Sequence, residues 1–406
     1  MLDFVPAHCV RRQNWHMKIG IDARTILNPE KGDAIGVGHY TYQLIRNLLQ
    51  IDKENEYVIF FDFHAREKDI KKFKQPNVKI KFYPFSDYKK YLPGAYNEIL
   101  GTATLAREHL DVIHSTSPTS RIPSSYRGKT VVTVHDLASY KVPDVFPKIK
   151  IARFKAVTSM MVGKADRIIA VSESTKKDIC EIFGCKEGKV EVIYSGIDKR
   201  FFEEPTISRE KIMAKFGISN HETKYILFLG TLEPIKNLSR LFEAYKIMRD
   251  TLKKETGKCD YKLVIAGKRG WLAEEYKKMA KDLEIGKDVI FTGYVIGDEI
   301  VPLFKNAEFF VMPSLYEGFG TTVLEAFATG TPAIVSNVSS VPEIAGDAAI
   351  MVNPINTQEI ADSMIQMAKD DKLRYDFRQK GFLQVRKFDW EKTARETLEI
   401  YKSLKK

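Results

Sequence analysis

The sequence has 406 residues, of which 44% are hydrophobic and 29% are charged, and its formal net charge is +11. This composition is typical of a soluble globular protein, and the length predicts two domains rather than one. No apolar run approaches the ~20 residues that a membrane-spanning helix needs. The positive charge favours an acidic partner, such as phosphates, anionic lipid or nucleic acid, without choosing among them.

The ends and the cysteines bear on the compartment. Residues 1–16 lack the apolar core and cleavage site of a signal peptide, and Met17 opens a strand, so we expect 1–16 to be a disordered extension. Cys9, Cys180, Cys185 and Cys259 have no metal-site spacing, which predicts free thiols in a reducing compartment. The predicted location is therefore the cytoplasm, with peripheral contact to the cytoplasmic membrane face left open.

From Lys18 onward, apolar β-branched runs alternate with amphipathic stretches. A first set of strands is predicted at residues 18–23, 57–61, 78–83, 112–115, 130–135, 167–171 and 190–194. A second set is predicted at 225–229, 262–266, 289–291, 309–312, 333–336 and 349–352. Because helical patterns lie between most of these strands, the fold class is α/β, with parallel sheets covered by helices on both faces.

A polar, proline-bearing segment (194–210) separates the two sets of strands. We therefore predict two Rossmann-like domains, residues 17–205 and 206–387, facing a central cleft where a ligand binds at the carboxyl ends of the strands. The tail, 388–406, predicts a helix capped by Asp389 with no strand after it, so it must pack on a domain already built.

Two motifs in the first half follow strands. Gly36 and Gly38 precede a helix predicted from about Tyr40, where they either allow close approach of a ligand or simply form a flexible turn. His135 and Asp136 end the strand in "VVTVHDLA". His135 could donate a hydrogen bond to a sugar hydroxyl or hold a nearby carboxylate, and the alternative is a histidine satisfied at the strand edge.

In the second half, Lys236 of "GTLEPIKN" lies near the start of a helix, where the helix dipole disfavours a cation. A phosphate bound at that terminus would explain the lysine, and the alternative is a solvated surface lysine. Lys268 and Arg269 follow another strand in a glycine loop, where they are either phosphate contacts or, as we favour, solubility charges.

The segment "EGFGTTVLE" places Glu317 and Glu325 around a glycine turn. Thr322 and Glu325 fit the capping-box spacing, so Glu325 has a structural explanation. Glu317 has none, and it precedes a helix predicted from about Thr321. A diphosphate on that helix terminus would leave Glu317 facing the attached group, where a carboxylate can bind hydroxyls or stabilise positive charge at an anomeric carbon.

These residues resemble the family 4 retaining glycosyltransferases, which have the GT-B fold of two Rossmann-like domains with a C-terminal crossover helix. The likeness covers nearly the whole chain from Met17, and its most specific part is the glutamate-x7-glutamate motif, Glu317 to Glu325. "GTLEPIKN" with "AGKRGW" is most similar to the mannosyltransferases of surface polysaccharide or lipid-linked glycan assembly. The resemblance thus implies transfer of a hexose, with mannose favoured, from a nucleoside-diphosphate sugar to a glycan or polyprenyl-linked acceptor.

The resemblance also implies residue roles. Glu317 and His135 would contact the donor sugar as the catalytic pair, Glu325 would bind the ribose hydroxyls, and Lys236 would hold the diphosphate. Val295 would lie by the nucleobase. The other donor contacts it implies are Gly36, Gly38, Gly318, Phe319, Gly320, Thr321 and Thr322.

Departures from the family pattern concern the phosphate cations. Thr231 and Ile235 stand where many relatives carry arginine, so one cation is missing or comes from Lys268 or Arg269. No Asp-x-Asp motif ends a strand, so we expect no essential metal and no cofactor, with GDP-mannose favoured as the donor substrate.

The acceptor side is less defined. The basic and aromatic stretch 73–96 and the helix predicted at 148–161 could rest on an anionic membrane, or they could form an ordinary solvated face. Alternatives to a transferase are another GT-B enzyme, such as a sugar-nucleotide epimerase or a phosphorylase, and a non-catalytic nucleotide-sugar-binding protein. A nucleic-acid binder ranks low because no recognition motif is present.

Overall fold

The computed structural model describes residues 16–26, 36–62, 70–83, 97–218, 223–268, 270, 272–295 and 297–405. Two sheets organise the chain, in the orders β3-β2-β1-β4-β5-β6-β7 and β10-β9-β8-β11-β12-β13. Neighbouring strands are parallel throughout both sheets. The predicted α/β class with two Rossmann-like halves is confirmed, whereas the expectation for residues 1–15 lies outside the described residues.

The strands match the apolar runs of the sequence. The first sheet contains β1 (Lys18–Asp22), β2 (Glu56–Asp62), β3 (Val78–Tyr83), β4 (Val112–Ser115), β5 (Lys129–Val134), β6 (Arg167–Ala170) and β7 (Val190–Val192). The second contains β8 (Lys224–Leu229), β9 (Tyr261–Ala266), β10 (Val289–Gly293), β11 (Phe309–Met312), β12 (Ala333–Ser336) and β13 (Ala349–Val352).

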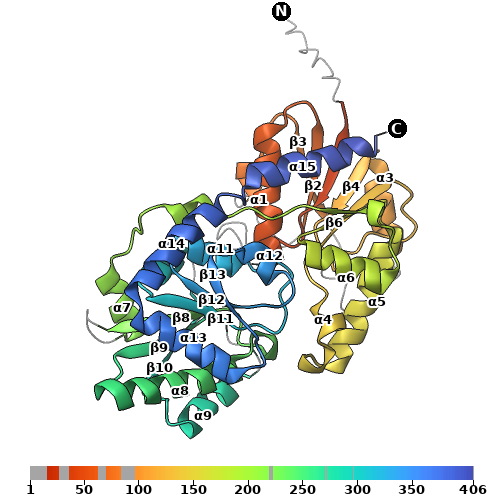
Figure 1. Ribbon diagram of the computed structural model, residues 1–406. Helices are drawn as coiled ribbons and strands as arrows, with labels where there is room; N and C mark the ends of the chain where they lie inside the picture. The colour runs from red at the N-terminus through yellow and green to blue at the C-terminus, as the bar shows by residue number, and fades with distance from the viewer. Residues whose placement is uncertain are drawn as a thin grey trace, which may run out of the picture.

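Helices connect most of the strands and cover both faces of each sheet (Figure 1). The first domain has α1 (Gly36–Ile51), α3 (Thr102–Arg107), α4 (Ala138–Lys141), α5 (Lys148–Lys164) and α6 (Glu173–Phe183). The second has α7 (Arg209–Phe216), α8 (Leu238–Thr256), α9 (Ala273–Asp282), α10 (Ile300–Lys305), α11 (Thr321–Ala328), α12 (Val341–Ala345), α13 (Thr357–Lys369) and α14 (Asp371–Val385). The last helix is α15 (Trp390–Ser403).

Alternate residues of each strand enter different cores. In β5, Val132 and Val134 pack with Met161 of α5 and Ile179 of α6, whereas Val131 belongs to the core on the opposite face, with α1. The second sheet divides its residues in the same way between α8, α9 and α13 on one face and α10 and α11 on the other. Burial on both faces is why these strands read as continuous apolar runs.

The chain passes between the domains twice. After β7, residues 193–208 lead into α7, which contacts β10 and α10 of the second domain. After α14, residues 386–389 lead back, and α15 packs along α1 of the first domain, as the blue helix in Figure 1 shows. Ile197, Phe388 and Trp390, from these two passages, belong to one apolar cluster that contains residues of both domains.

Within the described part of the chain, every helix falls short of the length and apolarity that spanning a membrane requires. Cys180, Cys185 and Cys259 are free thiols, as predicted, and Cys9 lies outside the described residues.

Candidate active site

A cavity of about 290 Å³ lies where the two domains meet. In each sheet the strand order reverses between two neighbours, β1 and β4 in the first and β8 and β11 in the second, and such reversals create a crevice at the carboxyl ends of the strands. Lys236 follows β8 and Glu317 follows β11, so the reversal in the second sheet brings these two residues together. The predicted site residues that line the cavity are Gly36, His135, Lys236, Glu317, Gly318, Phe319, Gly320, Thr321, Thr322 and Glu325.

Lys236 and Glu317 form an ion pair, with 2.6 Å between Nζ and Oε1. Lys236 ends a 3₁₀ turn (Pro234–Lys236), and Asn237, at φ 60°, anchors that turn by donating to the carbonyls of Pro313 and Pro354. The two side chains are 23% and 13% exposed, so this lysine is not the solvated surface cation that the alternative described. A cation and an acid are thus held side by side at the cavity wall.

The helix α11 begins at Thr321, because Gly320 takes a φ of +96° as its N-cap residue. A left-handed residue there favours glycine. The capping-box prediction is wrong, since Thr322 lies inside the first turn and its hydroxyl donates to Sδ of Met312 instead. The terminus therefore has no side-chain cap, and the backbone N–H groups of its first turn border the cavity.

Glu325 is consequently not a capping residue. It is only 5% exposed, and no described residue donates a hydrogen bond to its carboxyl group. Burial raises the pKa of this carboxyl to about 8, while the charge of Arg200 opposes the shift and that of Asp198 adds to it. A carboxyl group that is buried without a hydrogen-bond donor beside a cavity is a candidate for binding a ligand.

His135 lies just past β5, and its Nε2 is 2.7 Å from the carbonyl oxygen of Thr116. A carbonyl oxygen only accepts, so Nε2 carries the proton. Burial lowers the pKa of His135 to about 4, which keeps the ring neutral and leaves Nδ1 as an acceptor. The prediction that His135 donates a hydrogen bond to a ligand is therefore corrected: its proton is committed to Thr116.

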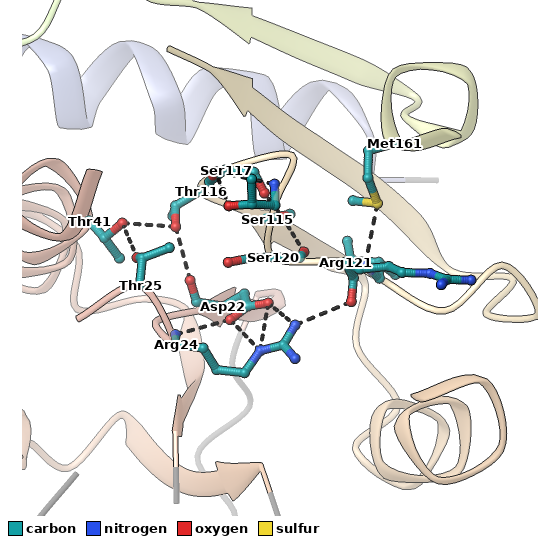
Figure 2. Close-up of polar contacts among 12 residues, drawn as sticks. Asp22, Arg24, Thr25, Thr41, Ser115, Thr116, Ser117, Ser120, Arg121 and Met161 are labelled. Carbon is teal, nitrogen blue, oxygen red and sulfur yellow. Dashed lines mark hydrogen bonds and ion pairs between the residues drawn. The ribbon is translucent and has the colours of Figure 1, made fainter. Parts of the chain in front are cut away.

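The residues behind His135 hold Thr116 in place. The Thr116 hydroxyl donates to the carbonyl of Asp22 at 3.0 Å and accepts from the Thr41 hydroxyl at 2.8 Å (Figure 2). Arg24 donates to the Asp22 carboxylate, with Nε 2.9 Å from Oδ1. This network at the carboxyl ends of β1 and β4 fixes the carbonyl that selects the His135 tautomer.

Gly318 is needed for contact between the domains. A Cβ atom there would overlap the carbonyl oxygen of His135. The Gly318 carbonyl accepts from the hydroxyls of Ser172, at 2.7 Å, and Thr175, at 3.1 Å, both on α6 or its cap. This glycine lets the loop of one domain meet the backbone of the other, which its prediction as a ligand contact did not include.

Two predicted contacts are not brought to the cavity. The helix α1 starts at Gly36, with φ 73°, about one turn before the predicted start near Tyr40. Gly38 therefore lies within its first turn and is absent from the cavity lining. Val295 is 3% exposed in the apolar core and does not line the cavity either.

Other residues of the cavity wall were not predicted. Tyr40 packs its ring edge-on against His135, with ring centroids 4.6 Å apart, and Trp390 arrives from the start of α15. The sequence signals only that both are aromatic residues of amphipathic helices. Lys268 is exposed and outside the cavity lining, and Arg269 lies outside the described residues.

Among the described residues, no group of three His, Cys, Asp or Glu side chains could hold a metal ion. The metal independence of the reaction remains a prediction.

Known proteins match nearly all of this chain. The family profile described as glycosyl transferases group 1 matches residues 208–405, and that of glycosyltransferase family 4 matches 35–201. The O-antigen chain mannosyltransferase B of Escherichia coli is 26% identical over 93% of this chain and 98% of its own length. A serotype-specific mannosyltransferase, WbdA, of Escherichia coli is 29% identical over 72% of this chain, which spans 36% of that longer protein.

A solved structure of Anabaena HepE in complex with UDP and glucose shares the fold. Its TM-score is 0.71 at 17% sequence identity, and the match covers 96% of this chain and 100% of that one. With the two family profiles on its two domains, the chain belongs to the family 4 glycosyltransferases, has the GT-B fold and is similar to the mannosyltransferases among them.

Proposed function

We propose that this glycosyltransferase moves a hexose, with mannose favoured, from a nucleoside-diphosphate sugar to a hydroxyl group of a glycan or lipid-linked acceptor, with retention of configuration. One observation carries the proposal: Lys236, Glu317 and the uncapped start of α11 border a single cavity between the domains. The mannosyltransferase names of the relatives support the sugar, and UDP in the HepE structure supports a nucleotide donor.

The donor diphosphate would bind where the cavity is most positive. The N–H groups of Thr321 and Thr322 and the ammonium group of Lys236 suit phosphate oxygens. Lys236 would then exchange its bond with Glu317 for the phosphate, which frees the Glu317 carboxylate to face the sugar. Glu325, whose carboxyl group receives no hydrogen bond from a described residue, would bind the ribose hydroxyls.

The transfer step breaks the bond between the anomeric carbon and the phosphate oxygen and forms one between that carbon and the acceptor oxygen. The proton of the acceptor hydroxyl passes to the leaving phosphate oxygen. Positive charge develops on the sugar ring in the transition state, where the Glu317 carboxylate stabilises it. His135 accepts a hydrogen bond from a sugar hydroxyl at Nδ1 and so orients the ring.

The test is a donor panel of GDP-mannose, UDP-glucose, UDP-GlcNAc and GDP-fucose, in which binding and slow donor hydrolysis are measured. We expect GDP-mannose to bind best, Lys236→Ala to weaken its binding, and Glu317→Ala to lower turnover by about 10²–10³-fold. Glu275→Ala, at an exposed acid of α9, is the control. Undiminished turnover in Glu317→Ala would remove the catalytic assignment, and no binding in the panel would refute the donor class.

A membrane-bound acceptor is part of the proposal. The start of α5 exposes Lys148 and Arg153, and Ile149 is 83% exposed. Basic and apolar side chains together favour an anionic bilayer surface. We expect the protein to sediment with vesicles containing anionic lipid, less so at high salt, and the Lys148→Ala/Arg153→Ala variant to sediment less than the wild type. Equal sedimentation with neutral vesicles would contradict this contact.

A further inference from the structure

Glu343 on α12 makes a contact between the domains that the proposed chemistry does not use. Its carboxylate accepts from the backbone N–H groups of Glu173 and Ser174, each at 2.9 Å, in the first turn of α6. The Tyr194 hydroxyl, from the connection that follows β7, donates to the same carboxylate at 2.9 Å. A second-domain acid thus binds both the first domain and the inter-domain connection.

The turn that leads into α12 also binds the backbone of Glu317. Ser339 accepts from the backbone N–H of Glu317 at 2.8 Å, and the Ser340 hydroxyl donates to the Glu317 carbonyl at 2.9 Å. Ser340 is the N-cap residue of α12, and Ser339 takes a φ of 53°, which is uncommon outside glycine. The backbone of Glu317 is therefore held on both sides by the turn that leads into the Glu343 helix.

Further contacts join the Glu317 loop to α6. Tyr316 donates from its hydroxyl to the carboxylate of Asp178 on α6 at 2.7 Å. The Gly318 carbonyl accepts from the hydroxyls of Ser172 and Thr175. Residues on either side of Glu317 are thus bonded to the helix whose first turn Glu343 binds.

We propose that Glu343 is a positioning residue: by binding the first turn of α6, it ties the Ser339–Ser340 turn, and with it the backbone of Glu317, to the first domain. This inference rests on the proposed function for its catalytic consequence, but the mechanical link is independent of it. A carboxylate bonded to two helix N–H groups gives a charge-assisted contact that a neutral side chain of equal length cannot reproduce.

The link is tested by amide hydrogen exchange, read by mass spectrometry with residue-level fragmentation. In Glu343→Ala we expect faster exchange at Glu173 and Ser174, which lose their acceptor. We also expect faster exchange at the Glu317 amide, which Glu343 does not touch. Glu275→Ala should leave all three amides unchanged. An unchanged Glu317 amide in Glu343→Ala would overturn the link, whatever the enzyme does with sugar nucleotides.

The catalytic consequence is tested by kinetics with the preferred donor. We expect Glu343→Ala to lower kcat by about tenfold with little change in the KM for donor, since a displaced catalytic group affects the transition state more than donor binding. Glu343→Gln, which keeps one acceptor oxygen, should recover part of the loss.

A double-mutant cycle separates a link from two independent effects. Ser340→Ala should also lower kcat while leaving exchange at Glu173 and Ser174 as in the wild type. If Glu343 acts through the serine turn, the double variant should lose little beyond the worse single variant. If the losses in kcat of the two single variants instead multiply in the double variant, the proposal is wrong. If the wild type turned over no donor at all, the proposed function would fail while the exchange result still decided the link.

Discussion

Glu325 carries a buried carboxyl group whose pKa is raised from an ordinary value of 4.5 to about 8. The folded protein therefore holds a proton that the unfolded chain releases between these two values. The stability contributed by this group is fully present below about pH 4.5, falls as the pH rises toward about 8 and then levels off. We expect Glu325→Gln to remove this loss, so that its melting temperature gains on that of the wild type as the pH rises.

The gain should correspond to about 1–3 kcal/mol at the alkaline end, since each pKa unit is worth about 1.4 kcal/mol and the cavity admits some solvent. Melting curves at a series of pH values measure it. Glu275→Gln, at an exposed acid, should follow the wild type at every pH. A constant difference between Glu325→Gln and the wild type would show that Glu325 is ionised in the folded protein.

The protonation state of His135 gives a second prediction for a single residue. Because burial lowers its pKa to about 4, its ring stays neutral over the working range, and the profile of kcat/KM against pH should show no His135 titration near 6.5. His135→Ala should lower kcat/KM by about 10–100-fold, through loss of the Nδ1 acceptor and of the bond to Thr116. A limb near pH 6.5 in the wild type that disappears in His135→Ala would contradict the neutral ring.

Sequence reasoning reached part of this chemistry. Lys236 and Glu317 follow strands of the second sheet, and parallel strands of one sheet end at one edge. His135 follows a strand of the first sheet, and two domains of this kind were expected to face a common cleft, so the meeting of the three residues at a cavity was predictable. The environment of Glu325 was not predictable, because its spacing from Thr322 fits a capping box as well as a ligand-binding role. The left-handed backbone of Gly320 decides against the capping box, because it makes Gly320 the N-cap residue. The helix then begins at Thr321, and Thr322 lies inside it and cannot cap it.

At the scale of elements, the strands were predictable because they carry apolar residues on both faces, as Val131, Val132 and Val134 do in β5. The start of α1 was placed about one turn late, since Gly36 and Gly38 read as a loop. Gly36 is in fact the first residue of that helix, with a positive φ, and Gly38 is tolerated inside it. Helix ends depend on single backbone conformations, which residue types indicate only weakly.

The contact between the Glu317 loop and the strand end at His135 gives a prediction for an element. Gly318→Ala would force a Cβ atom into the His135 carbonyl, so the loop must move away from the first domain. We expect kcat/KM for donor turnover to fall at least about 100-fold, because a displacement near 1 Å in a site costs that much.

Gly163→Ala is the matched control for this substitution. Gly163 lies in α5, where an added Cβ meets nothing within 4 Å, so alanine there should leave turnover unchanged. It should also raise stability by about 0.5–1 kcal/mol, because alanine favours a helix over glycine. Turnover in Gly318→Ala comparable to that in Gly163→Ala would show that the loop tolerates separation from His135.

Over the whole molecule, the contacts between domains lay beyond the sequence. Glu343 and Glu173 are far apart in the chain, and nothing in the local pattern around either residue signals the other. The sequence did indicate that the terminal helix must pack on a domain already built, because no strand follows it. Its partner, α1, required the structure, which shows α15 lying along that helix (Figure 1).

Because α15 packs on the first domain, a substitution in this last helix should destabilise the first domain. The Tyr401 hydroxyl lies 2.6 Å from Nδ1 of His114 on β4, and both side chains are fully buried. Tyr401→Phe removes this bond and leaves a buried ring nitrogen unpartnered, so the free energy of unfolding should fall by about 1–3 kcal/mol.

Since Tyr401 packs on the first domain, hydrogen exchange should speed up in α1, β4 and β5, although the substitution lies beyond the last strand of the second domain. Peptides from β8 to β13 should exchange as in the wild type. Tyr375→Phe, on α14 with the side chain 59% exposed, is the matched control and should change neither set. Faster exchange in the second sheet would mean that the domains unfold as one cooperative unit. In that case the crossing helix would stabilise the whole molecule rather than the domain it covers.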